Sequence, residues 1–269
     1  MEIYKYCPDY DKFTFSNLEN SIIHFTPVGN LNDPFDGFIY SKYIGTKSDI
    51  EKFLRNRMHI TNLSTIESIL ENLQPVGFGL YNAKAAEYHF GELENFCVSS
   101  FTREHKNILM WSHYANYHKG ICLKFESYED KKNNGFWFNE SVTPVEIEMF
   151  NNFSPLYRVK YSQNISVYNG IIDGSYQTFQ FAITKAINWQ YEHEYRLIQK
   201  LDTYGKLNFE INKEHLKAVY LGLKSNENVK MKIIEVLKQN YQQKGYNVEL
   251  YQAKRVVGKF EIDFDSLNY

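Results

Sequence analysis

Apolar and polar positions alternate over several short stretches of the chain, and elsewhere apolar residues recur at helical spacing. Alternation predicts strands, because successive side chains of a strand point to opposite faces, whereas a spacing of three or four residues predicts helices. The pattern predicts strands at residues 2–7, 21–27, 95–101, 120–126, 156–162, 216–222 and 246–256. It predicts helices at 48–73 in two pieces, 105–118, 175–189 and 226–245. No low-complexity linker or repeat separates these elements, so we expect a single α+β domain over residues 1–269.

The stretch NWQYEHEYRLI, residues 188–198, carries an unusual row of charge. It is rich in aromatic residues and ends in Arg-Leu-Ile, which favours a strand. In a strand, Glu192, Glu194 and Arg196 share one face, and Glu192 lies about 6.6 Å, one strand period, from Glu194. The pattern is compatible with a solvated charged face and with the polar side of a site.

The composition is that of a globular protein with many aromatic residues. The chain has 269 residues, of which 43% are hydrophobic and 23% charged, and this length suffices for a large core. Its 22 Tyr and 20 Phe make ring-lined pockets easy to build, although an A/T-rich genome would favour the same residues. The net charge of −2 provides no general basic field for nucleic acid, but a local basic groove remains compatible with it.

Cysteine usage and hydropathy predict where the chain resides. Cys7, Cys97 and Cys122 are an odd set without a CxxC pair, so we expect packed thiols and no disulfide framework. The N-terminal sequence lacks the basic and then apolar order of a secretory signal. No window approaches about 18 uninterrupted apolar residues, the length of a membrane span. We therefore expect a cytoplasmic protein that does not contact the membrane.

Several familiar motifs are absent from the sequence. There is no GxxxxGK[ST] or GxGxxG loop for phosphate, and no GxSxG or HExxH. His113 and His118 are five residues apart, so a helix would not bring both to one ion, and we expect no metal site. Three other clusters remain: NDPFD at 32–36, SSFTREHKNILMWSHYA at 99–115, and the charged residues Glu192, Glu194 and Arg196.

The first two clusters each have a structural and a functional interpretation. Asp33 before Pro34 is a common way to start a turn, and the alternative is a rigid loop in which Asn32 or Asp36 contacts a ligand. In the second cluster a helix would align three rings on one face, at positions i, i+3 and i+7, and the preceding strand ends in hydroxyl residues. The three rings are those of Trp111, Tyr114 and His118.

The order of these pieces resembles an uncharacterised bacterial family, domain of unknown function 2971, which is related to abortive-infection proteins of the AbiGi type. The similarity covers residues 1 to about 200. The matching pieces are Tyr4-Lys5-Tyr6, Asn32 to Asp36, Ser100-Phe101, Met110 to Ala115, Gly120, Lys185, Trp189, Glu192, Glu194 and Arg196.

A more remote similarity is to ADP-ribosyltransferases, including poly-ADP-ribose-polymerase-like domains. CVSSFT, MWSHYA, GICLKF and EYRLI stand where that family has its serine strand, helix, Gly-led strand and glutamate strand. The resemblance implies a split mixed sheet with flanking helices, a core over 1–201 and a strand–helix–strand extension over 202–269. It implies that Glu194 is catalytic and that Lys5 or His24 replaces the first-strand His or Arg of the family. The residues then expected to bind NAD are Lys5, Tyr6, His24, Ser100, Phe101, Trp111, Tyr114 and Arg196.

The resemblance also implies a chemistry for the charged row. A carboxylate such as Glu194 stabilises the positive ribose that develops when the nicotinamide bond of NAD breaks, and Glu192 serves the acceptor. Arg196 keeps both carboxylates ionised or contacts the pyrophosphate. This predicts a toxin or phage-defence effector that acts on RNA, DNA or protein, with an antitoxin or chaperone as a possible partner. The alternatives are a non-catalytic binding module and a metal-dependent nuclease that uses Asp33, Asp36, Glu192 and Glu194.

Overall fold

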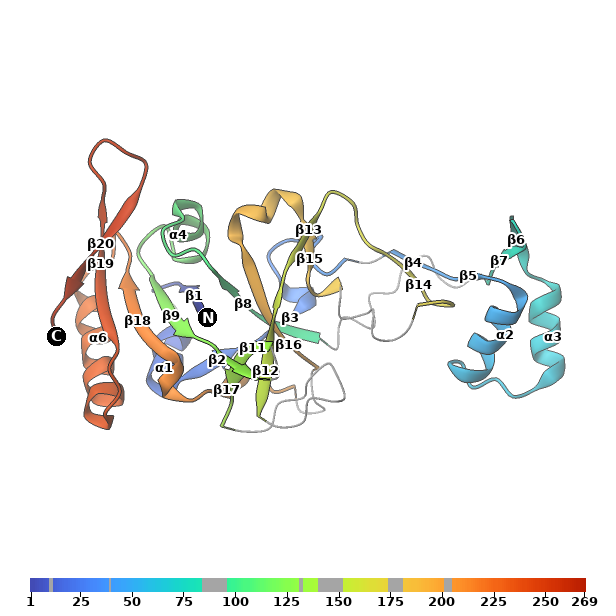
Figure 1. The fold of residues 1–269 in the computed structure, drawn as a ribbon, viewed down its shortest axis with the longest axis horizontal. Coiled ribbons are helices and arrows are strands. Elements are labelled where there is room, and N and C mark those ends of the chain that lie inside the picture. Colours follow the sequence, from blue (N-terminus) through green and yellow to red (C-terminus); the bar gives the residue numbers. More distant parts are fainter. Residues whose placement is uncertain are drawn as a thin grey trace. The chain divides into compact units, whose positions relative to one another are not determined.

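The computed structural model describes residues 1–9, 12–38, 40–83, 96–130, 133–139, 152–173, 181–200 and 205–269 (Figure 1). The chain divides into two compact units. Unit 1 consists of Met1–Pro27, Phe96–Val159 and Asn188–Tyr269, and unit 2 of Val28–Asn95 and Lys160–Ile187. The hydrophobic pattern does not reveal this division, because the segments of the two units alternate along the chain and no compositional linker separates them.

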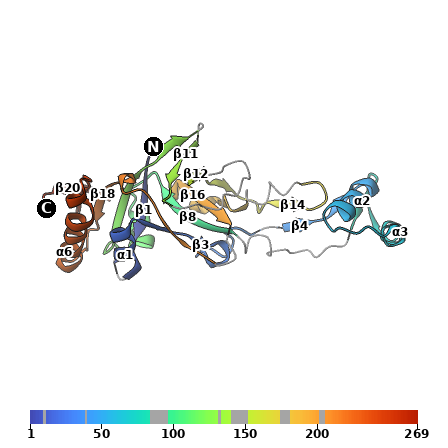
Figure 2. The ribbon, with the colours of Figure 1, turned by 90° about the horizontal axis from the view of Figure 1, so that it is seen from below.

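Unit 1 is built on a mixed sheet, and the predicted α+β class is confirmed. The strand order is β10-β11-β12-β16-β8-β1-β9-β18-β19-β20, and β3 also pairs with β8. These neighbours are antiparallel, except that β18 and β19 are parallel. Figure 2 shows β11, β12, β16 and β8 next to one another in this sheet. The strands are β1 (Glu2–Cys7), β3 (Thr26–Pro27), β8 (Phe96–Thr102), β9 (Ile121–Glu126), β10 (Tyr128–Asp130), β11 (Asn133–Trp137), β12 (Phe153–Arg158), β16 (Glu194–Lys200), β18 (Leu216–Leu221), β19 (Glu249–Arg255) and β20 (Ile262–Leu267).

Helices and a small second sheet complete unit 1. The α-helices are α1 (Lys12–Asn20), α4 (Ile108–Tyr114) and α6 (Glu227–Val236), and a π-helical turn η5 (Leu237–Tyr241) and a 3-10 turn η6 (Gln242–Lys244) prolong α6. Shorter 3-10 turns are η3 (Ile187–Glu192) and η4 (Lys213–His215). The small sheet pairs β2 (Ile22–His24) with β17 (Asn208–Glu210). Among the described residues no helix is long and apolar enough to cross a membrane.

Alternation along the strands gives the large sheet two different faces. On β1 and β9, Ile3, Leu123 and Phe125 join the core formed with α1 and α6, and we call this side the α1 face. Tyr4, Tyr6 and Cys122 point the other way and pack with α4, and we call this side the α4 face. The opposite orientation of neighbouring residues is the period of two that a strand imposes.

Strands β1 and β8 pair at Tyr4 and Thr102, and further along β8 the strand β3 takes the place of β1. Tyr4 of β1 pairs with Thr102 at the end of β8, while at its other end β8 pairs with β3, through Val98 and Cys97. Between these points the Lys5 ammonium donates hydrogen bonds to Ser99 Oγ at 2.9 Å and to the Ser100 carbonyl oxygen at 3.1 Å. A lysine side chain from β1 therefore contacts the middle of β8.

Unit 2 is organised around two helices. Helices α2 (Lys47–Asn56) and α3 (Leu63–Glu71) fill the predicted two-piece helical segment and enclose a core of Ile50, Leu54, Ile66 and Ile171. A 3-10 turn η1 (Val28–Asn30) precedes them. The strands of this unit are β4 (Tyr40–Lys42) with β14 (Val167–Asn169), β5 (Ile44–Gly45) with β7 (Leu80–Asn82) and β6 (Gln74–Gly77), and β13 (Lys160–Ser162) with β15 (Thr184–Ala186).

Three predicted elements differ from the structure. The strand expected from residue 188 begins at Glu194, since residues 187–192 form η3 and His193 adopts a positive φ of 45°. The helix expected over 105–118 ends at Tyr114. The described part of the helix expected over 175–189 consists of residues 181–189, which contain β15 and the start of η3, and residues 174–180 lie outside the described residues.

The strand–helix–strand expected near the C-terminus is part of the large sheet. β18 pairs with β9 along most of its length, and β19 pairs in parallel with β18. Residues 205–269 therefore extend the same sheet that holds β1, β8 and β16.

A buried histidine joins three elements at one edge of the α1 core. His215 is fully buried, and its Nε2 accepts a hydrogen bond from the Trp137 backbone N–H at 3.1 Å. Its Nδ1 must then carry the proton and donate to the Glu126 carbonyl oxygen at 2.8 Å. Burial lowers the pKa of His215, and the hydrogen bond to Glu126 acts in the opposite direction. The folded protein therefore requires the neutral ring.

This requirement predicts acid sensitivity. In the unfolded chain His215 takes up a proton near pH 6.5, while the folded ring resists protonation, so stability is lost as pH falls below about 6.5. We expect His215→Gln to lower the free energy of unfolding by about 1–3 kcal/mol at pH 7.5. The same variant should weaken the decrease in stability between about pH 6.5 and 5. Urea denaturation at several pH values measures both effects.

The matched control is His113→Gln, because His113 is exposed on α4. It should leave both the stability and its pH dependence near those of the wild type. Some acid sensitivity will persist in either variant, since burial lowers the pKa of His105 to about 4. An unchanged pH dependence in His215→Gln would show that the ring is not the titrating group.

Candidate functional site

A buried ion pair occupies the start of β16. Arg196 Nε donates to Glu194 Oε1 at 2.6 Å, and Arg196 Nη2 donates to Glu194 Oε2 at 3.1 Å. The two side chains are two residues apart and lie on one face of the strand, as the alternation predicts. Glu194 is 4% exposed and Arg196 is fully buried. This two-point geometry fixes the direction of the carboxylate as well as its charge.

Strand β8 places hydroxyl groups beside this pair. Glu194 is directly opposite Thr102, and Arg196 is directly opposite Ser100. Tyr4 of β1 pairs with Thr102, so Tyr4 and Tyr6 also lie on the α4 face. Three neighbouring strands thus present polar side chains on the same face of the sheet.

The second carboxylate comes from η3 and not from the strand. Glu192 is 2% exposed, and its Oε1 accepts a hydrogen bond of 2.6 Å from the Tyr114 hydroxyl on α4. Its backbone oxygen accepts from Thr102 Oγ1, and the Tyr191 carbonyl oxygen accepts from Asn107 Nδ2 at 3.0 Å. The side chains of Thr102 and Asn107 bind the carbonyl groups of η3, so these groups do not pair in the sheet. This explains why the observed strand begins later than predicted. The prediction that Glu192 and Glu194 lie in one strand is therefore wrong, because β16 begins at Glu194.

Helix α4 forms an aromatic wall over this face. Trp111 is fully buried, its indole N–H donates to the His105 carbonyl oxygen at 2.8 Å, and its ring meets Tyr6 edge to face at 5.2 Å. The chain then reverses through Asn116, Tyr117 and His118, all with positive φ. His118 stacks on Trp111 with a centroid distance of 6.2 Å. The predicted ring contact thus arises from a left-handed turn and not from a longer helix.

The tyrosine of β1 is fixed in the same wall. The Tyr6 hydroxyl donates to the Glu104 carbonyl oxygen at 2.8 Å, and burial raises its pKa, so the phenol stays neutral. Gly120 closes the left-handed turn against β1, because an added Cβ would lie only 2.2 Å from the Cys7 carbonyl oxygen. This close contact accounts for the glycine between the MWSHYA helix and the next strand.

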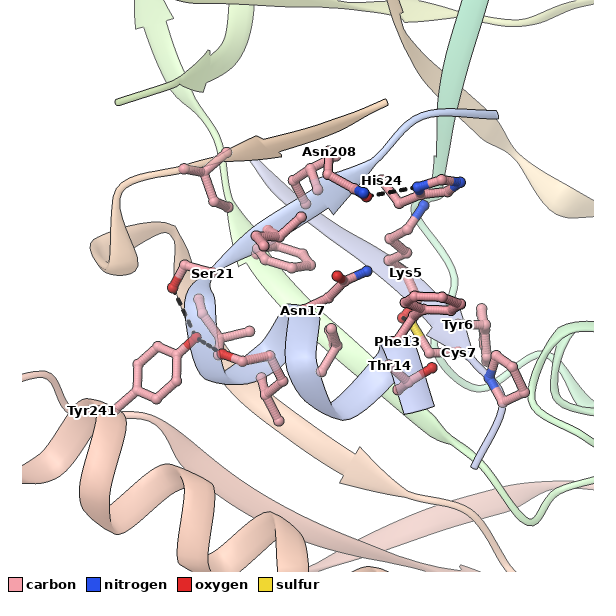
Figure 3. A pocket seen from close by; sticks show the side chains of 18 of the residues that line it. Lys5, Tyr6, Cys7, Phe13, Thr14, Asn17, Ser21, His24, Asn208 and Tyr241 are labelled. Carbon is pink, nitrogen blue, oxygen red and sulfur yellow. Dashed lines mark hydrogen bonds between the residues drawn. The ribbon is translucent and has the colours of Figure 1, made fainter. Parts of the chain in front are cut away.

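Three of the residues predicted to bind NAD lie on the α1 face instead. Lys5 borders a cavity of about 380 Å³ together with His24, whose Nδ1 is hydrogen-bonded to Asn208 Oδ1 at 2.8 Å (Figure 3). Phe101 is buried in the α1 core and stacks on Phe136 at 5.4 Å. Burial lowers the pKa of the Lys5 ammonium, and electrostatic interactions with Cys7 and Glu194 oppose this effect.

The predicted set is therefore divided by the sheet. The α4 face brings together most of the predicted site residues, including those of the glutamate strand, the serine strand and helix α4. They are Tyr6, Ser100, Trp111, Tyr114, Glu192, Glu194 and Arg196. The register of β1 on β8 determines this division, because it turns Tyr4 and Tyr6 towards that face and Lys5 away from it.

The NDPFD motif belongs to unit 2 and is a turn. Asp33 Oδ1 accepts from the Phe35 backbone N–H at 2.9 Å, as the turn interpretation predicts. Asp36 is buried and forms an ion pair of 3.6 Å with Lys185, which is also one of the residues that carry the resemblance to domain of unknown function 2971. Within the described residues, no group of three or more His, Cys, Asp or Glu is arranged to hold a metal ion.

Asn107 is a positioning residue that the sequence pattern did not single out. Its Oδ1 caps α4 by accepting from the Leu109 and Met110 N–H groups, while its Nδ2 holds η3. An Asn immediately before an apolar helical run is an N-cap signal, so the start of the helix was visible in the sequence. The contact with η3 depends on tertiary structure and was not.

Comparison with known proteins gives one match. Residues 110–197 match the model of the family described as Protein of unknown function (DUF2971). This span contains Trp111, Tyr114, Glu192, Glu194 and Arg196, so most of the candidate site lies within it. No curated protein and no solved structure matches the chain. Residues 110–197 are therefore similar to the family of unknown function DUF2971, and the resemblance drawn from the sequence motifs is confirmed over this span.

Proposed function

We propose that unit 1 is an NAD-dependent ADP-ribosyltransferase in which Glu194 is the catalytic carboxylate. The observation that carries this proposal is the arrangement of β1, β8 and β16 as neighbours, with Tyr6, Ser100 and Glu194 on one face. The remote resemblance requires the first strand, the serine strand and the glutamate strand to contribute to one site. Their adjacency supports the resemblance, although these strands are far apart in the sequence.

The chemistry of the α4 face is suited to NAD. Aromatic rings from β1 and α4 offer apolar surfaces for the flat nicotinamide group. Ser100 is partly exposed on β8 and supplies a hydroxyl beside the ion pair. Arg196 is fully buried with two of its nitrogens bound to Glu194, which favours the role of keeping that carboxylate ionised over the role of contacting pyrophosphate.

Glu194 acts on the ribose next to nicotinamide. Its carboxylate accepts a hydrogen bond from the ribose 2′-hydroxyl and stabilises the positive charge that develops as the carbon–nitrogen bond breaks. Nicotinamide leaves as a neutral ring and takes the bonding electrons. A nucleophilic oxygen or nitrogen of the acceptor then forms the new bond to the same carbon and releases its proton.

Glu192 serves the acceptor side. Its carboxylate is oriented by Tyr114 and its backbone by Thr102, so it is held independently of the Arg196–Glu194 pair. A carboxylate fixed in this way can receive the proton that the acceptor loses. The separate contacts of the two carboxylates support the proposal that they serve two different steps.

The proposed setting is inside the cell, with RNA, DNA or protein as the acceptor. The relation of the motif set to abortive-infection proteins supports a toxin or phage-defence effector that acts in the cytoplasm. Such an activity would need a trigger or an inhibiting partner, either an antitoxin or a chaperone, to protect the cell that makes it.

We expect Glu194→Gln to reduce nicotinamide release from NAD by about 10²–10³-fold, because one well-placed electrostatic group is lost. Glutamine retains the size of the side chain and one acceptor for Arg196, but it leaves the buried guanidinium without a counter-charge, so we expect a folded variant of lower stability, which circular dichroism and urea denaturation check. Release of labelled nicotinamide, measured with EDTA present, tests the reaction without any contribution from a metal-dependent nuclease.

The control is Glu129→Gln, which removes an exposed carboxylate from β10 and should not alter the rate. Full activity in Glu194→Gln would contradict the proposal. So would a wild-type protein that releases no nicotinamide, either in buffer or in a cell extract that supplies nucleic acid and protein acceptors. In that case a non-catalytic binding module becomes the better interpretation.

A second prediction separates the two carboxylates. Glu192→Gln and Tyr114→Phe both disturb the acceptor-side carboxylate and leave the Arg196–Glu194 pair in place. Both variants should reduce labelling of the acceptor by about 10-fold or more, which is less than the full contribution of a general base. Hydrolysis of NAD by water should continue in both. Nicotinamide release and acceptor labelling are measured side by side for each variant.

Equal loss of both activities in Glu192→Gln would show that this carboxylate also acts on the ribose. An unaffected acceptor reaction in both variants would show that the Tyr114–Glu192 hydrogen bond is only structural.

A further inference from the structure

A cavity of about 380 Å³ lies on the α1 face of unit 1, on the side of the sheet opposite the Glu194 site. Helix α1 and strands β1, β2 and β9 contribute to its lining (Figure 3). Its volume lies within the usual range for small-molecule sites. The walls are mainly apolar side chains of the α1 core, including Leu18, Ile23, Leu123 and Phe125.

The polar groups of this cavity gather at two ends (Figure 3). At the inner end Tyr241 and Ser21 are hydrogen-bonded to each other at 3.0 Å, and the Tyr241 hydroxyl also donates to the Leu18 carbonyl oxygen. These groups satisfy one another. The other end carries Lys5, Asn17 and the His24–Asn208 pair, and it is open because His24 and Asn208 are exposed.

The open end has hydrogen-bonding capacity to spare. The Lys5 ammonium has three donors, and the structure provides acceptors for two of them, Ser99 Oγ and the Ser100 carbonyl oxygen. Among the described residues, no carboxylate lies within ion-pair distance of Lys5, and no side-chain hydrogen bond is formed by the Asn17 amide. Glu194 acts on Lys5 only from a distance, as its carboxylate is bound by Arg196.

A cation without a neighbouring carboxylate, at the mouth of an apolar cavity, favours an anion with an apolar body. We propose that this cavity binds a small apolar monocarboxylate, with the carboxylate at Lys5 and the apolar chain directed towards Tyr241. The Asn17 amide supplies a further donor beside the carboxylate. The apolar body displaces water from the core side of the cavity.

This site does not depend on the proposed transferase activity. The two sites lie on opposite faces of the sheet, and the ligand is recognised without NAD. Binding can therefore be measured on the whole protein without substrate, and either proposal can fail while the other holds.

The test uses octanoate as the probe and 1-octanol as its uncharged counterpart, with affinities measured by isothermal titration calorimetry. We expect the wild type to bind octanoate more tightly than octanol. Lys5→Met keeps the length of the side chain and removes its charge, so it should weaken octanoate binding by about tenfold or more, as loss of a charge-assisted hydrogen bond implies. Its affinity for octanol should be unchanged.

The matched control is Lys124→Met. It removes a lysine from β9 on the α4 face, where Lys124 pairs with Glu2, and should leave octanoate binding unchanged. A second variant, Asn17→Phe, places a ring in the cavity from α1 and should abolish binding of both probes. It keeps the test informative if Lys5→Met does not fold, which circular dichroism reports.

Three results would overturn the proposal. The first is a wild type that binds octanoate no better than octanol, or not at all. The second is a folded Lys5→Met with wild-type affinity for octanoate. The third is retention of octanoate binding in Asn17→Phe, which would place the ligand elsewhere.

Discussion

The buried ion pair of Arg196 and Glu194 is the interaction on which the rest of the candidate site depends. An unpaired buried guanidinium or carboxylate is strongly unfavourable, so each of these side chains constrains the other. Because both lie on β16, their pairing fixes the face of that strand towards α4. Ser100 and Thr102 on β8 then line the same site through the register of the two strands.

A large part of this arrangement could be predicted from the sequence. The α+β class, the common face of Glu194 and Arg196 and the ring contact of Trp111 with His118 follow from local pattern or are close to it. The start of strand β16 could not be predicted from the sequence, because Thr102 of β8 and the Asn107 side chain bind the carbonyl groups of η3. Contacts between segments far apart in the sequence decided that boundary, and a local pattern carries no information about them.

The position of Lys5 shows the same limit for the site. Its strand was predicted, but a shift of one residue in the pairing of β1 with β8 would exchange the two faces. The observed Tyr4–Thr102 pair turns Lys5 to the α1 face, where it borders an apolar cavity and bonds to the Ser99 hydroxyl and the Ser100 carbonyl group. One strand thus serves two different environments, a buried polar network on one face and an apolar cavity on the other.

We propose that the Arg196–Glu194 pair serves the chemistry of the site and is not required for stability. The most direct test replaces both residues together, Glu194→Leu with Arg196→Met, and measures urea unfolding and nicotinamide release on the same protein. The account predicts a folded variant whose stability is within about 1–2 kcal/mol of the wild type or above it, since apolar residues often replace a buried ion pair without loss. It also predicts no detectable nicotinamide release. A folded double variant that releases nicotinamide at the wild-type rate would contradict the account.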